Sequence, residues 1–140
     1  MINAFVATSI LVETGDRVPF AGHRAQTRSS CHCNGGWLTH EDGSGQFLIA
    51  RAGVYMIGVG AQVTSAVAAT VATLALTVNG EALAGTEMAS TLTASGDIAQ
   101  LATTALVTVP CGASVTVGLA NTGDADITVN EASLVLTRIA

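Results

Sequence analysis

Residues 42–64 read DGSGQFLIARAGVYMIGVGAQVT, and this stretch decides the fold of the chain. It begins with an acidic, glycine-rich turn at 42–45, continues through the apolar run Phe47-Leu48-Ile49, and then alternates from Val54 to Thr64. Alternation with a period of two is typical of a β-strand, because successive side chains point to opposite faces. The stretch therefore predicts a turn between strands and indicates an all-β protein.

Both faces of the strand expected at 54–64 are free of charge. One face carries Tyr55, Ile57, Val59, Ala61 and Val63, and the other carries Val54, Met56, Gly58, Gly60 and Gln62. A half-exposed antiparallel strand normally alternates apolar with polar residues, whereas a strand covered on both faces is apolar throughout. The pattern therefore predicts that something covers each side of this strand.

The rest of the chain continues the strand pattern. Further strands are expected at 4–12, 37–40, 71–78, 101–109, 114–121 and 127–139, separated by turns rich in Gly, Asn, Asp and Pro. The pair Asn79-Gly80 favours a tight hairpin, because both residues tolerate positive φ. A helix over the alanine-rich segment 66–75 is rejected, because several of its residues are β-branched and no capping pattern precedes it. Residues 1–140 are expected to form one domain, a two-sheet antiparallel sandwich or jelly roll.

Composition predicts self-association. Charged residues make up 11% of the chain, against about 25% in a typical domain, so contiguous apolar surface is hard to avoid unless other subunits cover it. The net charge is −5 and the five basic residues are all Arg, so nucleic acid is not an expected partner. The apolar stretch from Ile2 to Val12 lacks a basic leader, and is expected to be a strand of a chain made without a signal peptide and without membrane insertion.

The order of several short motifs resembles the C1q/TNF-like jelly roll over essentially the whole chain. These motifs are Ala4-Phe5-Val6-Ala7, Val18-Pro19-Phe20, Gly45-Gln46-Phe47, Gly53-Val54-Tyr55 and Ser133-Leu134-Val135-Leu136. The chain is most similar to the small Ala/Thr/Val-rich versions found in phage head-fibre and decoration proteins and in spore-surface glycoproteins. It shares with them the hairpin Asn79-Gly80-Glu81 and cysteines near positions 31–33 and 111.

This resemblance implies a ten-stranded, two-sheet sandwich that forms a tight homotrimer, with one sheet packed around the threefold axis. The residues expected at the trimer interface or in the core are Phe5, Trp37, Val54, Tyr55, Met56, Ile57 and Val59. Ile57 and Val59 replace aromatic residues typical of the animal members, and no collagen-like stalk is expected before the domain. Complement or cytokine function is therefore not carried over.

The cluster Cys31-His32-Cys33 is the sharpest chemical candidate in the sequence. Thiolate and imidazole are ligands that Zn²⁺ prefers, and three copies around a trimer axis could complete a tetrahedral site, although the spacing differs from that of known zinc modules. A disulfide from Cys31 or Cys33 to Cys111 is a second interpretation, and reduced loop thiols are a third.

Two acidic turns are candidates for Ca²⁺, one at Glu41-Asp42 and the other at 124–126, although solvated turn residues are the simpler interpretation. The pair His40-Glu41 lacks the second His of a zinc-protease motif, and Gly43-Ser44-Gly45 is not a nucleophile elbow. We therefore expect no enzyme and no catalytic residue. No cofactor is expected, with Zn²⁺ and Ca²⁺ as alternatives.

Two functions are compatible with these features. The first is a structural virion protein: a homotrimeric phage capsid decoration or head-fibre module, made in the host cytoplasm and located on the capsid surface, with major capsid or other virion proteins as partners. The second is a trimeric receptor- or glycan-binding adhesin head of a phage tail fibre or of a spore or cell surface, with a host surface glycan as its partner.

Overall fold

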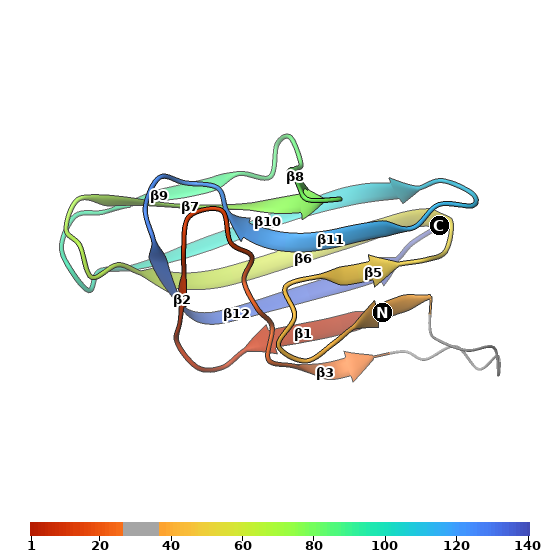
Figure 1. Cartoon of the computed structure of the whole chain (residues 1–140), viewed down its shortest axis with the longest axis horizontal. Helices are drawn as coiled ribbons and strands as arrows, with labels where there is room; N and C mark the ends of the chain where they lie inside the picture. The colour runs from red at the N-terminus through yellow and green to blue at the C-terminus, as the bar shows by residue number, and fades with distance from the viewer. Residues whose placement is uncertain (27–36) are drawn as a thin grey trace.

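The computed structural model describes residues 1–26 and 37–140 and consists of two antiparallel sheets packed face to face (Figure 1). Sheet A has the strand order β10 (Ile98–Val109), β6 (Gly53–Thr64), β12 (Ile127–Arg138), β1 (Ile2–Val6), β3 (Gly22–Gln26), with β2 (Ile10–Val12) also paired to β12. Sheet B has the order β4 (Leu38–His40), β5 (Phe47–Ile49), β11 (Val115–Asn121), β7 (Thr70–Val78), β8 (Glu81–Ala82), with β9 (Met88–Leu92) also paired to β7. The all-β, two-sheet antiparallel sandwich predicted from the sequence is confirmed.

The core lies between the two sheets and takes one face of β6. On that face Tyr55, Ile57 and Val63 are fully buried, and Val59 and Ala61 are at most 5% exposed. Leucines of β7 and β11 in sheet B are buried in the same core, namely Leu74, Leu76 and Leu119. The hydroxyl of Tyr55 donates a hydrogen bond to the carbonyl oxygen of Arg51 at 2.8 Å, so the ring is buried without an unsatisfied polar atom.

Two details of the strand prediction are wrong. The strand expected at 4–12 is two strands, β1 and β2, which pair with different parts of β12. The pairing register of β12 with β6 shifts between Val129 and Glu131, and beside this irregularity the Ser9 hydroxyl donates to the Asn130 side chain at 3.0 Å. The described residues also form twelve strands, whereas the resemblance implied ten.

The expected hairpin at Asn79-Gly80 is confirmed. Asn79 has φ of 52° and Gly80 has φ of 86°, and the flanking residues Val78 and Glu81 pair directly. This is the two-residue connection that positive φ at both positions permits. The Asn79 side chain also accepts a hydrogen bond from the backbone N–H of Thr116 at 3.0 Å, which fixes the turn to β11.

The rejection of a helix at 66–75 is also confirmed, because β7 begins at Thr70 after a turn. Among the described residues, no helix has the length and apolar character needed to cross a membrane.

A matched pair of leucine substitutions tests whether the core lies between the sheets. Leu119→Ala removes a fully buried side chain and should lower the free energy of unfolding by about 2–5 kcal/mol. Leu48→Ala changes a side chain that is 41% exposed on sheet B and should cost about 1 kcal/mol or less. Urea unfolding at one fixed protein concentration measures both, and equal losses would contradict the packing described here.

Candidate functional site

Sheet A leaves one broad face outside the sandwich. Strands β10, β6 and β12 run side by side along the longest dimension of the molecule (Figure 1). Their side chains alternate between the core and this surface, which we call the outer face and define as the residues of the three strands that point away from sheet B. In these strands Glu131 is the one ionisable residue at such a position.

The outer face carries large apolar side chains among threonines toward its ends, and small residues in its middle. Met56 and Leu106 are directly paired at one end, with exposed fractions of 38% and 60%, and Ile98 at the other end is 61% exposed. In the middle Gly60 pairs with Ala102 on one side and with Ser133 on the other. A Cβ atom added at Gly60 would meet no heavy atom within 4 Å. Another protein surface could therefore approach the backbone closely here.

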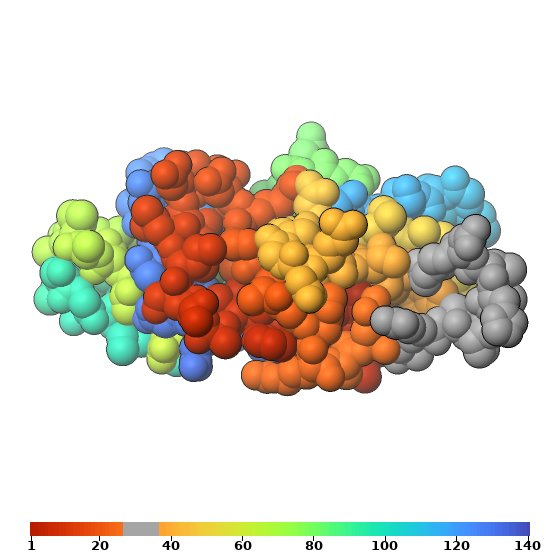
Figure 2. Space-filling model, turned by 60° about the horizontal axis from the view of Figure 1, so that its bottom comes forward, coloured from red at the N-terminus to blue at the C-terminus, as the bar shows by residue number. Residues whose placement is uncertain are grey.

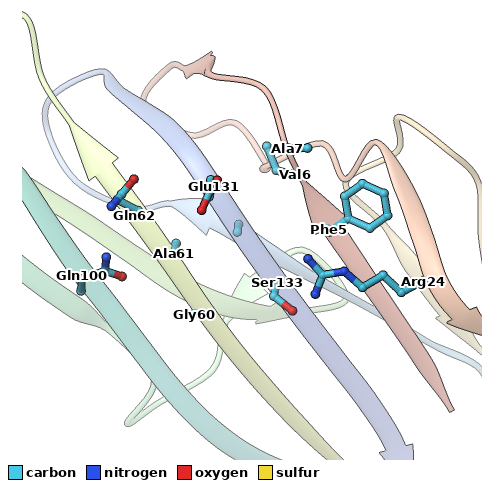
Figure 3. A pocket seen from close by; sticks show the side chains of 11 residues that line it. Phe5, Val6, Ala7, Arg24, Gly60, Ala61, Gln62, Gln100, Glu131 and Ser133 are labelled. Atoms are coloured by element: carbon cyan, nitrogen blue, oxygen red, sulfur yellow. The ribbon is translucent and has the colours of Figure 1, made fainter.

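A shallow groove of about 250 Å³ crosses the outer face at Gly60 and continues onto β1 and β3 (Figure 3). Gln62, Gln100 and Glu131 lie at one end of the groove. Phe5 and Arg24 lie at the other, where the guanidinium carbon is 5.4 Å from the centre of the aromatic ring. The groove thus offers amide, carboxylate and cationic groups around a centre of small residues, Gly60 and Ser133, and it could accept a protruding side chain of a partner.

The residues predicted for the trimer interface or the core fall into two groups in the structure, one at the outer face and one in the core. Val54 and Met56 belong to the outer face, and Phe5 lies half-buried beside it on β1. Tyr55, Ile57 and Val59 lie in the core, as the alternation predicts.

Trp37 is away from the outer face. It is half-buried, with its ring centre 5.8 Å from that of Tyr55 and 5.9 Å from the guanidinium carbon of Arg51. Sequence reasoning placed Gly60 and Met56 on one face but missed that Ala102 and Leu106 belong to the same face. The alternation within 98–109 was the signal that could have found Ala102 and Leu106, but only the register places them beside Gly60 and Met56.

The cysteine predictions are mostly outside the described structure. Cys31, His32 and Cys33 lie outside the described residues, so the proposed metal cluster stays a prediction. Cys111 lies exposed in the turn after β10, and its pairing with Cys31 or Cys33 also stays a prediction.

One carboxylate of each acidic turn contacts a protein group. Asp126 accepts a hydrogen bond from the backbone N–H of Thr14 at 2.9 Å. Asp42 lies 3.2 Å from a ring nitrogen of His23. His23 in turn contacts His40, whose pKa is lowered by burial against the opposing effect of a hydrogen bond to the Ser44 carbonyl. This grouping of His23, His40 and Asp42 was not predicted, because β3 and β4 belong to different sheets.

Comparison with known proteins identifies the fold. No protein-family model and no curated protein matches the chain. Among solved structures, the globular domain of zebrafish complement 1qA protein is similar over 99% of this chain and 98% of its own, with 12% identity and a TM-score of 0.64. Eiger TNF from S. frugiperda is similar over 99% of this chain and 92% of its own, with 12% identity and a TM-score of 0.67. The chain therefore has the C1q/TNF-like jelly-roll fold.

The exposure of Cys111 gives a direct test of its redox state. In the folded chain without reductant, we expect iodoacetamide to modify Cys111 at a rate close to that of a small free thiol, because the side chain is accessible to solvent. Peptide mass mapping measures the modification, with the Cys31→Ser/Cys33→Ser double variant as the control. Protection of Cys111 that disappears on reduction, in the parent chain but not in the double variant, would show a disulfide instead.

Proposed function

We propose that the protein is a structural virion protein, a homotrimeric phage capsid decoration or head-fibre module. The observation that carries the proposal is the outer face of sheet A, which exposes Met56, Leu106 and Ile98 and has Glu131 as its one ionisable residue. Burying such a face removes apolar area from water and requires the desolvation of few charges. In this proposal, two further copies of the chain cover the outer face.

The outer face is suited to close packing between copies. Glycine and alanine at its centre allow backbones to approach, and the aliphatic residues at its ends supply area whose burial contributes about 25 cal/mol per Å². The low charge content of the whole chain supports the same arrangement, because a charge-poor domain gains solubility when copies cover its apolar surface.

The assignment to a virion is supported by the resemblance of the sequence to small phage versions of the fold. In this role the protein assembles and carries out no reaction. Its partners are other copies of itself and the major capsid protein or other virion proteins. The three copies would present the loops at the ends of the sandwich away from the threefold axis, and the protein would be located on the capsid surface.

A trimeric receptor- or glycan-binding head is the second candidate. It is favoured by Trp37, which is half-buried close to the exposed side chain of Arg51, since such a pair can contact a partner through an aromatic surface and a cation together. Three such sites on one trimer would bind a surface glycan with avidity even if each were weak.

One binding experiment separates the two candidates. Fluorescently labelled protein is mixed with purified capsids that lack it, and separately with host cells, and each mixture is sedimented. We expect saturable binding to capsids and none to cells. Saturable binding to cells that is reduced by Trp37→Ala, together with no binding to capsids, would contradict the virion role and favour the adhesin.

A substitution at the centre of the outer face tests self-association. Gly60→Val places a β-branched side chain where the single chain has open space, so the fold should be retained. Between copies the same side chain would hold two surfaces apart, and we expect the variant to dissociate at concentrations where the parent stays associated. Native mass spectrometry measures the distribution of oligomers.

Ala89→Val is the matched control. Ala89 is exposed in β9 of sheet B, so this variant adds a similar side chain away from the outer face and should associate like the parent. Unchanged association of Gly60→Val, with a normal circular dichroism spectrum, would mean that copies do not pack through the outer face.

A further inference from the structure

A pair of histidines joins the free edges of the two sheets. β3 is an outermost strand of sheet A and β4 is an outermost strand of sheet B, and each carries one of the two rings. His23 Nε2 lies 2.6 Å from His40 Nδ1. In Figure 2 the orange residues of the β3 region lie against the amber residues that follow position 37. The contact therefore joins two edge strands, β3 and β4, that belong to different sheets and are not paired with each other.

The second nitrogen of each ring already has a partner that can only accept a hydrogen bond. His40 Nε2 lies 2.7 Å from the carbonyl oxygen of Ser44, so this nitrogen carries a hydrogen and donates it. His23 Nδ1 lies 3.2 Å from Oδ1 of Asp42, and an ionised carboxylate likewise only accepts. When both rings are neutral, the two nitrogens that face each other are therefore both unprotonated.

Two lone pairs at 2.6 Å repel each other, and a cation between them removes the repulsion. A proton is one such cation and a metal ion is the other. The contacts of the other two ring nitrogens, His23 Nδ1 and His40 Nε2, are typical of metal-bound histidines. In such histidines the nitrogen opposite the metal donates to a carboxylate or a backbone carbonyl. Here Asp42 and the Ser44 carbonyl occupy these two positions.

His40 is held in place to act as a ligand. Its side chain is buried and stacks on the ring of Phe47, with ring centres 4.2 Å apart and an interplanar angle of 16°. Phe20 packs against it edge-on at 6.4 Å. These two aromatic contacts fix the plane of the His40 ring, so its Nδ1 faces His23 without a further change of rotamer.

We propose that His23 Nε2 and His40 Nδ1 bind a divalent transition metal ion, of which Zn²⁺ is the best match, with Asp42 and the Ser44 carbonyl orienting the two rings. Imidazole nitrogen suits Zn²⁺, and tetrahedral coordination with Zn–N distances of about 2.0–2.1 Å puts two ligand nitrogens about 3.3 Å apart. The facing nitrogens need to separate from 2.6 Å by about 0.7 Å. His23 lies on an edge strand and can make this movement.

Water completes the coordination on the side open to solvent, where the Asp42 carboxylate is 71% exposed. The bound ion would clamp the edge of sheet A to the edge of sheet B. An ion that binds the folded chain and not the unfolded chain stabilises the fold, so the melting temperature should rise with Zn²⁺ concentration.

The test is a titration of the full chain with Zn²⁺. Isothermal titration calorimetry measures binding, and thermal unfolding with and without Zn²⁺ measures the change in melting temperature. The parent background is Cys31→Ser/Cys33→Ser, which removes both thiolates of the other candidate zinc cluster, Cys31-His32-Cys33. We expect this protein to bind one Zn²⁺ per chain and to melt at a higher temperature when Zn²⁺ is added. In the same background His23→Gln should abolish both effects.

Two further variants separate ligation from folding. Asp42→Asn alters an exposed side chain and should weaken Zn²⁺ affinity by about 10–100-fold, because Asp42 orients His23 without binding the ion. Glu41→Gln is the matched control, an exposed neighbour outside the contact, and should bind like the background. Absence of Zn²⁺ binding by the folded background protein, or binding that His23→Gln leaves unchanged, would overturn the proposal and leave a proton as the shared cation.

Discussion

Coverage of strand β6 on both faces is the constraint on which the rest of the structure depends. Its inner face is complete within one chain, because Tyr55, Ile57 and Val63 are fully buried against sheet B. Its outer face, which includes Met56, Gly60 and Gln62, is also free of charge and lies between β10 and β12, which extend the surface on either side. A charge-free face in the middle of an open sheet favours coverage by another surface, and in our proposal other copies of the chain cover it.

Local sequence pattern predicted much of the fold, since alternation and turn chemistry act over a few residues. The hairpin at Asn79-Gly80 is an example, because two residues with positive φ are sufficient to define it. The break between β1 and β2 was missed because the two strands pair with parts of β12 on either side of a register shift, where Ser9 contacts Asn130 across more than a hundred residues of sequence. No window of the N-terminal segment contains that information.

The candidate sites also differ in how much of each can be predicted from local sequence pattern. Met56 was found because alternation along one strand places it opposite the core, and its partner Leu106 was missed because the register between β6 and β10 is a property of the sheet. The histidine pair could not be predicted from local sequence pattern or from the pairing of strands within one sheet. His23 and His40 meet only because the two sheets pack so that β3 and β4 lie edge to edge, and the sequence between them gives no sign of this contact.

The molar mass of the chain in solution tests self-association most directly. Multi-angle light scattering after size exclusion, repeated over a range of concentrations, should give about three times the chain mass of 14.0 kDa, independent of concentration. A mass equal to one chain at every concentration would contradict the proposal, because the outer face of sheet A would then be stable in water without a copy to cover it.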